Sequence, residues 1–406
     1  MKKGVTILIA LCISGALMGQ KPRVQPMSEV VKNSMDFAVK QHMFLANTLK
    51  DSSTLLPKTT DWNSKLVTCK SDWWTSGFFP GSLWYLFEYS KNEQVKKMAE
   101  LYTARVENQK YTTDNHDVGF MLYCSFGNGY RITGNKAYKE VLVTGAKSLS
   151  TRFREKVGCI QSWDIVSWNK NRGWQCPVII DNMMNLELLA EATRMSGDSS
   201  FYKIAVSHAN VTMENHFRPD YSSFHVVDYN LADGSVRRQQ TEQGYADGSS
   251  WSRGQGWALY GYTVMYRETK DKKYLDWARR IAEYVMEQLK PIEDKIPYWD
   301  YNAPNIPDAY RDASAGALTC SALIELSQYV DKATAKRYLA IAEQQIRSLS
   351  AAPYRAELGK NGGFILKHSV GSIPGKTEVD VPLSYADYYF IEAMLRYKKV
   401  VLDAKH

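Results

Sequence analysis

The stretch Thr193-Arg194-Met195-Ser196-Gly197-Asp198 carries the signals that end one helix and begin the next. Gly197 suits the left-handed position just past a helix, and Asp198 suits the N-cap of the helix that follows. Short polar turns of this kind occur five times, and their anchor residues are Asn92, Asn135, Asp198, Asp271 and Asp331. The recurrence predicts a repeating unit of two helices, with short turns at one end and loops of variable length at the other.

The helices that flank these turns are of two kinds. Residues 119–130, 183–192 and 256–266 are apolar and aromatic nearly all round, which is typical of buried helices. Residues 272–289 and 333–349 are apolar on one face only, which is typical of helices that face water. Apolar periodicity predicts about twelve helical stretches, from residues 28–49 to residues 383–402. Six inner and six outer helices that close on themselves give an all-α fold, an (α/α)6 barrel; an open helical solenoid is the alternative.

Two acidic residues stand where a loop runs into a strongly apolar helical stretch. They are Asp117, in Asn115-His116-Asp117-Val118, and Asp181, in Ile180-Asp181-Asn182. Taken singly, either one is explained by an N-cap role. In the predicted barrel, however, all inner helices begin at the rim where the long loops gather, so both acids converge there with Arg253 and the Asp312/Ser314 region. Long loops on a rigid scaffold are where sites are built, so the pair is a candidate site.

Bulk properties favour a secreted enzyme with one large domain. The 406 residues, 44% of them hydrophobic, suffice for a sizeable core. Met1-Lys2-Lys3 and the apolar run after it predict a signal peptide over residues 1–19, which leaves residues 20–406 as a single catalytic domain. We expect a periplasmic location in a Gram-negative bacterium. No second apolar run is long enough to span a membrane, and the five remaining cysteines show no disulfide or metal-type spacing.

Several classes of chemistry lack their motifs in this chain. There is no HExxH, paired CxxC, P-loop or GxSxG sequence, and no basic stripe indicates nucleic-acid binding. His116 has no second metal ligand at helical spacing, so a hydrogen-bonded loop histidine is its simpler interpretation. We predict no cofactor, no metal and no obligate protein partner. The 11 Trp and 26 Tyr residues, several of them in predicted rim loops, favour carbohydrate as the substrate; filling of the core is the alternative.

The residues from about 70 to about 395 resemble the unsaturated glucuronyl hydrolases of glycoside hydrolase family 88. The resemblance rests on motifs whose order and spacing are specific together: Trp74-Thr75-Ser76-Gly77-Phe78, His116-Asp117-Val118-Gly119-Phe120, residues 177–188, Gln243-Gly244-Tyr245, Ser252-Arg253-Gly254-Gln255-Gly256-Trp257 and Ala386-Asp387-Tyr388-Tyr389-Phe390. It implies the (α/α)6 barrel already predicted from the helix count. It also implies an anionic substrate, an oligosaccharide with a 4,5-unsaturated uronic acid at its non-reducing end.

The resemblance further implies a mechanism that needs two carboxyl groups and no metal. Asp181 is similar to the acid/base that protonates C4 of the unsaturated ring and activates the water that adds at C5. Asp117 is similar to its partner, which holds ring hydroxyls and raises the proton affinity of Asp181 through like charge. Because the reaction is the hydration of a vinyl ether, the separation of the carboxyl groups does not report retention or inversion.

Other roles follow from the same resemblance. Trp74 would stack on the unsaturated ring, and Arg253 and Trp257, four apart on one helix, would reach one ligand. His225, Thr241 and Gln243 would bind hydroxyls or the carboxylate. Ser369 and Ser372 match a serine pair that contacts the carboxylate or the next sugar. For Arg253 an outward, solvated position is the alternative, and for the serine loop it is a flexible linker.

Three points stay open at the level of the sequence. Any of Trp163, Trp168 and Trp174 is a candidate second aromatic of the site. Residues 169–172, with Arg237, Arg238, Lys367 and Lys376, form a basic group that favours sulfated glycosaminoglycan fragments, although ordinary surface charge explains it equally well. The rival functions are an unsaturated rhamnogalacturonyl hydrolase acting on pectin fragments and a non-catalytic glycan-binding helical protein.

Overall fold

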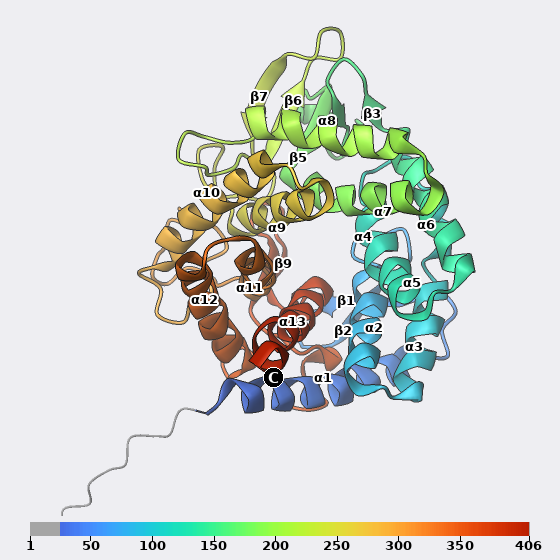
Figure 1. Cartoon of the computed structure of the whole chain (residues 1–406), viewed down its shortest axis with the longest axis vertical. Coiled ribbons are helices and arrows are strands. Elements are labelled where there is room, and N and C mark those ends of the chain that lie inside the picture. The colour runs from blue at the N-terminus through green and yellow to red at the C-terminus, as the bar shows by residue number, and fades with distance from the viewer. Residues whose placement is uncertain (1–24, 406) are drawn as a thin grey trace, which may run out of the picture.

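A computed structural model describes residues 25–405, and these form a closed ring of helices around one axis (Figure 1). The inner positions hold α2 (Phe78–Ser90), α4 (Val118–Leu122) continued by α5 (Asn128–Thr133), α7 (Leu186–Ser196), α9 (Ser252–Thr269), α11 (Ala313–Leu326) and α13 (Ser384–Tyr397). The outer helices are α1 (Met27–Leu49), α3 (Glu93–Ala104), α6 (Lys136–Ser150), α8 (Ser199–Asn215), α10 (Lys272–Leu289) and α12 (Lys332–Ser350). The last inner helix, α13, packs against α2 and α11, so the ring closes. The predicted (α/α)6 barrel is confirmed, and the open solenoid is wrong.

The five short turns begin the outer helices as predicted. Each anchor residue occupies an N-cap, and its side-chain oxygen accepts a hydrogen bond from the backbone amide two residues later; the anchors are Asn92, Asn135, Asp198, Asp271 and Asp331. Gly134 and Gly197 end their inner helices with φ of 67° and 78°, a conformation that a side chain would strain. The short turns therefore all lie at one end of the barrel, and the long loops lie at the other.

Burial separates the two sets of helices as their composition predicts. Every residue of α11 is buried, whereas α10 buries one stripe that includes Tyr274, Ala278, Ile281, Val285 and Leu289. The predicted helix over residues 119–130 is interrupted by a π-helical segment, η2 (Tyr123–Gly127). There the Ser125 hydroxyl donates to the Met121 carbonyl, and such a side-chain bond competes with the regular helical ladder.

Aromatic side chains of the inner helices close the barrel across its axis. Phe120 lies 5.2 Å from Trp257 between ring centroids, Trp257 lies 5.5 Å from Tyr389, and Tyr389 lies 5.6 Å from Tyr260. Phe78 contacts both Phe120 and Tyr389, at 5.4 and 5.9 Å. We call Phe78, Phe120, Trp257 and Tyr389 the aromatic floor, because they separate the mouth at the long loops from the mouth at the short turns.

The long loops carry small antiparallel sheets that the helical periodicity did not predict. The strands are β1 (Leu56–Thr60), β2 (Leu66–Cys69), β3 (Phe153–Arg154), β4 (Cys159–Ile160), β5 (Cys176–Ile179), β6 (Val226–Tyr229), β7 (Val236–Gln240), β8 (Ser369–Ser372) and β9 (Thr377–Val381). They pair as β1-β2, β3-β4, β5-β6-β7 and β8-β9. The three-stranded sheet joins the loop before α7 to the loop before α9, and so links two segments far apart in sequence.

Two further features of residues 25–405 bear on the predictions. All five cysteines in this range are free thiols, and four of them are buried. No helix in this range combines the length and apolarity needed to cross a bilayer. The predicted signal peptide, residues 1–19, lies outside the described residues.

Candidate active site

The three-stranded sheet places Asp181 beside His225. Ile179 at the end of β5 pairs with Val226 at the start of β6, and the Ile180 amide donates to the His225 carbonyl at 3.0 Å. Asp181 then lies in a short 3-10 turn, η4 (Ile180–Asn185), that leads into α7. Its Oδ2 lies 3.6 Å from His225 Nε2.

The hydrogen bonds of His225 fix which of its ring nitrogens carries the proton. Its Nδ1 accepts from the backbone amides of Glu242 and Gln243, at 3.1 and 3.2 Å, and must therefore be unprotonated. Burial, aided by the positive charge of Arg253, holds the pKa of His225 well below its usual 6.5, so the ring is neutral. The single proton is on Nε2, the atom that faces Asp181.

Asp117 has a matching arrangement with His116. Asn185 Oδ1 accepts from the Phe120 amide at 3.0 Å, which orients the Asn185 amide group so that its Nδ2 faces His116 Nδ1 at 3.5 Å. The His116 proton is accordingly on Nε2, and this atom lies 3.3 Å from Asp117 Oδ1. Asp117 is at the N-cap of α4, yet its side chain makes no capping bond. The N-cap explanation therefore fails for Asp117, and His116 is a hydrogen-bonded loop histidine, as predicted, that lies beside Asp117.

Burial raises the proton affinity of both carboxyl groups. It raises the pKa of Asp181 to about 7, against the opposing influence of the Arg253 charge and the Trp257 indole. Burial, together with the negative charge of Asp181, raises the pKa of Asp117 to about 8. We expected burial or the like charge of Asp117 to raise the pKa of Asp181, and burial is the main cause of the raised pKa of both groups. Near neutral pH the pair can hold a proton to donate.

Polar atoms without an internal partner concentrate at this rim. Among residues 25–405, the following buried side-chain atoms here have no hydrogen-bond partner: Asp181 Oδ2, His225 Nε2, His116 Nε2, Trp257 Nε1, Arg253 Nε, Ser369 Oγ and Tyr385 OH. Buried polar groups are nearly always satisfied in folded proteins. A cluster of unsatisfied donors and acceptors at the open end of a barrel is therefore a site that awaits a polar ligand.

Arg253 is buried, so the solvated alternative is wrong, but most of its donors are already used. Its Nη1 donates to Asp312 Oδ2 at 3.1 Å and to the Val370 carbonyl. Its Nη2 donates to Gln243 Oε1 at 2.9 Å and to the Gly371 carbonyl at 2.7 Å. Only Nε remains without a partner within the described residues.

Gln243 and Thr241 lie in the same loop, as predicted, and their side chains form different internal hydrogen bonds. The Gln243 amide oxygen is held by Arg253, which leaves its amino group to face a ligand. The Thr241 hydroxyl accepts from the Gly244 amide at 2.8 Å and closes the turn. Thr241 thus shapes the loop that presents Gln243.

Trp257 and Trp74 lie at different depths below the rim. Trp257 is fully buried in the aromatic floor, with its indole nitrogen toward Asp181. Trp74 is half-buried and lies 5.0 Å from Tyr385 and 5.6 Å from Phe120, between ring centroids. Trp74 therefore offers an accessible ring above the floor, whereas Trp257 offers only its indole N–H.

Ser369 and Ser372 form strand β8 of a hairpin, so the linker alternative for this segment is wrong. Ser369 is fully buried beside the carbonyls that Arg253 binds. The Ser372 hydroxyl accepts from the Gly375 amide at 3.0 Å and helps to close the hairpin. Of the two, Ser369 has the hydroxyl without an internal partner within residues 25–405.

The geometry distinguishes the three candidate tryptophans. Trp163 lies 6.2 Å from His225 between ring centroids and pairs through its backbone with Asn115, close to Asp117. Trp174 is buried and donates its indole N–H to Gln240. Trp168 is 54% exposed and contacts Trp163, with the ring centroids 5.2 Å apart. Trp163 is the one that borders the site.

The predicted basic group is largely paired within the protein. Arg172 forms an ion pair with Glu242, and Arg237 forms one with the buried Asp228. Lys367 donates to the Ala352 carbonyl at 2.9 Å. These contacts reduce the charge that this group can offer to a sulfate.

Sequence reasoning missed Tyr385 as a site residue. Its hydroxyl has no partner within residues 25–405, and its ring contacts Trp74 and lies 5.4 Å from the Arg253 guanidinium. The only signal was its position, one residue before the motif that begins at Ala386. Nothing in its spacing distinguishes it from the tyrosines that fill the core.

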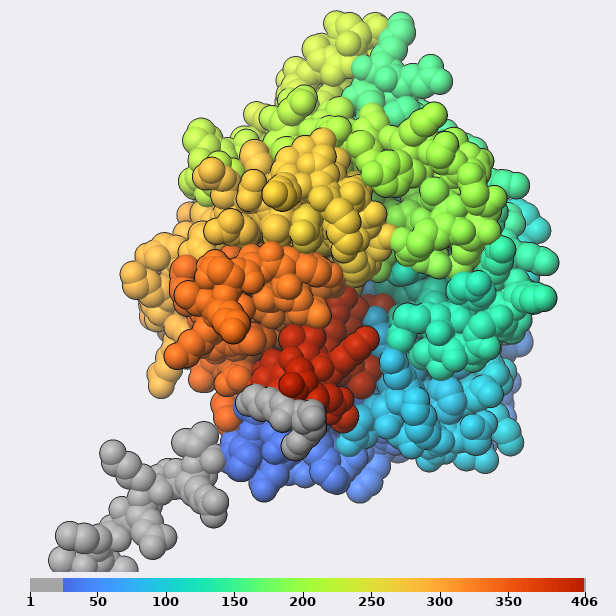
Figure 2. All heavy atoms as spheres, in the orientation of Figure 1, coloured from blue at the N-terminus to red at the C-terminus, as the bar shows by residue number. Residues whose placement is uncertain are grey.

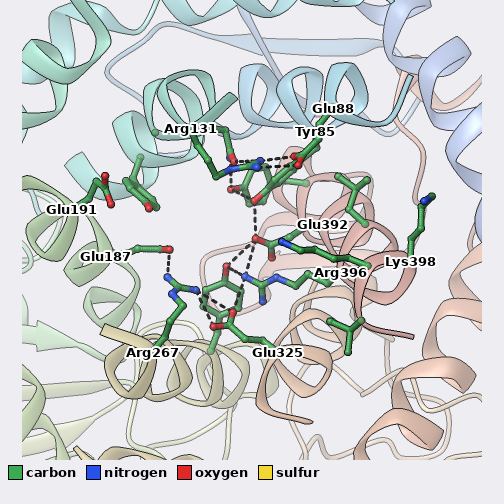
Figure 3. Close-up of a pocket in the computed structure, with 18 of the residues that line it drawn as sticks. Tyr85, Glu88, Arg131, Glu187, Glu191, Arg267, Glu325, Glu392, Arg396 and Lys398 are labelled. Carbon is green, nitrogen blue, oxygen red and sulfur yellow. Dashed lines mark hydrogen bonds and ion pairs between the residues drawn. The ribbon is translucent and has the colours of Figure 1, made fainter. Parts of the chain in front are cut away.

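A cavity of about 860 Å³ opens at the opposite mouth, seen as the hollow near the centre of Figure 2. Figure 3 shows charged side chains pointing into it, but the buried ones are paired with each other. Arg267 binds Glu187 and Glu325, and Glu392 accepts from Tyr85, Tyr260, Ser321 and Arg396. Because its buried charges satisfy one another, this cavity is a structural network and not the candidate active site.

Comparison with known proteins identifies the family. The profile of Glycosyl Hydrolase Family 88 matches residues 34–399. The chain belongs to glycoside hydrolase family 88. Family membership makes it a glycoside hydrolase and excludes the non-catalytic alternative.

Its relatives share most of its length. An unsaturated glucuronyl hydrolase from Formosa agariphila is 47% identical over 330 residues, 81% of each chain. An unsaturated chondroitin disaccharide hydrolase from Streptococcus pneumoniae is 33% identical over 332 residues, 80% of this family 88 enzyme and 82% of the relative. The crystal structure of an unsaturated glucuronyl hydrolase specific for heparin has a TM-score of 0.88 and 43% identity, and covers 92% of this chain and 98% of its own.

Proposed function

We propose that this family 88 enzyme removes the 4,5-unsaturated uronic acid from the non-reducing end of lyase-generated oligosaccharides, principally glycosaminoglycan disaccharides. The names of the relatives support this substrate class, since they include glucuronyl and chondroitin disaccharide hydrolases. The observation that carries the proposal is the buried carboxyl of Asp181, whose pKa of about 7 lets it act as an acid at neutral pH.

The proposed reaction is a hydration of the C4=C5 double bond. The protonated carboxyl of Asp181 gives its proton to C4 of the ring, and positive charge develops at C5 and the ring oxygen. The carboxylate so formed takes a proton from water as the water oxygen bonds to C5, which restores the acid. The product carries a hydroxyl on C5 next to the ring oxygen and is a hemiketal. It opens spontaneously and releases the next sugar.

The residues around Asp181 fit both steps of this reaction, the proton transfer to C4 and the addition of water at C5. His225 Nε2 lies 3.6 Å from Asp181 Oδ2, and a hydrogen bond that forms there once Asp181 has given up its proton would stabilise the carboxylate. Asp117, whose Oδ1 lies 3.3 Å from His116 Nε2, is placed at the same rim to hold ring hydroxyls. Trp74 supplies the apolar face for the ring.

Loss of the ultraviolet absorbance of the conjugated C4=C5 bond tests the proposal. We expect wild type to remove it from unsaturated glycosaminoglycan disaccharides and Asp181→Asn to leave it unchanged. Asp271→Asn is the matched control, because Asp271 only caps α10 at the opposite end of the barrel. Turnover by Asp181→Asn at the wild-type rate would refute the role of Asp181, and no turnover by wild type would refute the reaction.

The unsaturated rhamnogalacturonyl hydrolase reaction uses the same chemistry on pectin fragments. Lyase-cut pectin is therefore assayed beside sulfated and unsulfated glycosaminoglycan disaccharides. The names of the relatives favour glycosaminoglycan disaccharides as the better substrates. A kcat/KM that is higher on pectin fragments than on these disaccharides would reverse the substrate assignment without changing the role of Asp181.

We also propose that the enzyme is exported and works in the periplasm. The support is the sequence of residues 1–19, a basic start followed by an apolar run. N-terminal sequencing of the protein purified from its natural host tests this; a mature chain that begins near Gln20 is expected, and a chain that retains Met1 would contradict it.

A further inference from the structure

Asp312 and Arg253 form an ion pair in the interior of the long-loop rim. Their side chains are 0% and 1% exposed, and Asp312 Oδ2 lies 3.1 Å from Arg253 Nη1. A charged pair removed from water is expensive to bury, so it persists only where other hydrogen bonds complete it. The completing bonds here all lead to segments that carry predicted site residues.

The pair binds the β8–β9 hairpin from two sides. Arg253 donates to the carbonyls of Val370 and Gly371, which are consecutive residues of β8. Asp312 Oδ1 accepts from the Val370 amide at 3.4 Å and from the Ser314 amide at 2.9 Å, so it also caps α11. The position of Ser369, next to Val370, depends on these bonds.

The same guanidinium holds a second loop. Arg253 Nη2 donates to the side-chain oxygen Oε1 of Gln243, and the backbone N–H of Gln243 donates to His225 Nδ1. The chain of contacts from Asp312 thus reaches both the hairpin and the histidine that faces Asp181. Among residues 25–405, Arg253 Nε is the one donor of this side chain without a partner, and that N–H is flanked by the Trp251 ring, 4.4 Å from the guanidinium carbon.

We propose that Asp312 is a positioning residue of the active site: it fixes Arg253 as a clamp that holds the β8–β9 hairpin and Gln243 in place for the substrate. In this arrangement Arg253 acts mainly through the segments it clamps and not as the counterion of the substrate carboxylate. The inference rests on the proposed function for its substrate, although the clamp itself does not.

The two possible roles of Arg253 predict opposite effects of Asp312→Asn. If Arg253 were the counterion of the substrate, Asp312 would compete with the substrate carboxylate, and its neutralisation would lower KM or leave it unchanged. If Arg253 is the clamp, the new amide group faces the Arg253 donors, the hairpin loosens, and KM rises by about tenfold. Asn retains the oxygen that accepts from the Ser314 amide, so the substitution leaves the cap of α11 in place and changes only the contact with Arg253.

A second variant keeps the test decisive if Asp312→Asn folds poorly. Arg253→Lys preserves the positive charge but replaces a planar fork of donors with a single ammonium, which cannot serve Asp312, Gln243 and two carbonyls together. The clamp predicts that KM rises in this variant as well. Wild-type KM in Arg253→Lys would overturn the proposal.

Proteolysis reports on the hairpin without reference to catalysis. Lys376 is exposed at the tip between β8 and β9, so trypsin can cut there when the hairpin opens. We expect Asp312→Asn to be cut at Lys376 about tenfold faster than wild type under native conditions. Asp331→Asn, which removes an N-cap acid at the opposite rim, is the matched control and should be cut at the wild-type rate.

The outcomes separate the clamp from the proposed reaction. Faster cleavage at Lys376 with a raised KM supports the clamp, and unchanged cleavage with an unchanged or lower KM overturns it. If wild type acts on no unsaturated disaccharide, the proposed function fails, and the rate of cleavage alone still decides for or against the clamp.

Discussion

In the proposed reaction, the pH dependence of turnover follows from the protonation of Asp181. The proposed reaction needs this carboxyl in its acid form, and burial raises its pKa from 3.8 to about 7. A raised pKa keeps the proton on the group up to higher pH, so activity is present below pH 7 and is lost as the pH rises through it. Above that point kcat/KM falls about tenfold for each pH unit.

The size of the effect follows from the fraction protonated. At about pH 6.5 a carboxyl with a pKa of about 7 is roughly 75% protonated, whereas one with an ordinary pKa is about 0.2% protonated. Burial of Asp181 therefore raises the concentration of the active form by roughly 400-fold at that pH. Few single features of the site have an effect of this size.

Asp117→Asn tests whether Asp181 alone sets the alkaline limb. The pKa of Asp117, about 8, lies above the pKa of Asp181, about 7, so Asp117 is still protonated and uncharged while Asp181 titrates. Replacement by an equally uncharged Asn should therefore leave the alkaline limb of kcat/KM, followed by ultraviolet absorbance on an unsaturated disaccharide, near pH 7. A limb that moves by about one pH unit or more, or a wild-type limb near pH 4, would refute the reasoning.

Three other substitutions test separate parts of the structure. His225→Phe keeps a ring in place but removes the N–H directed at Asp181, so kcat should fall about a hundredfold, and thermal unfolding measured in parallel shows whether the fold survives. Trp163→Ala should raise KM about tenfold, whereas Trp168→Ala, at a side chain 54% exposed and farther from the site, should change KM less than threefold; equal effects would contradict the placement of Trp163. Glu392→Gln removes one of the two carboxylates that Arg396 contacts, while Glu325 still pairs with it at 2.9 Å, and should lower the free energy of unfolding by about 1 kcal/mol in a urea titration, with KM unchanged.

The fold was predictable because its main signals are local. Each of the anchors from Asn92 to Asp331 caps a helix with its own side chain, and a cap depends on only a few neighbouring residues. The all-round apolar character of residues 256–266 likewise reports burial directly. The sheets in the long loops depend on pairing between distant segments, such as Ile179 with Val226, and no local pattern announces that pairing.

The site was predictable as a set of residues but less so as a set of contacts. The resemblance named Asp117, Asp181 and Arg253, and the structure brings them to one rim. It did not predict that Arg253 would be occupied by Asp312 and by backbone carbonyls of β8, because those partners come from two segments that are distant from it in sequence. Tyr385 was missed for a similar reason, since only the closed ring places α13 beside Trp74.

The aromatic floor makes the barrel a blind cup and not a tube. A polysaccharide cannot thread through a blind cup, so only the terminus of a chain can reach the acids at its base. The uronic acid that is cut off must leave by the opening through which it entered, after the remainder of the chain has withdrawn. Each encounter therefore removes a single terminal residue.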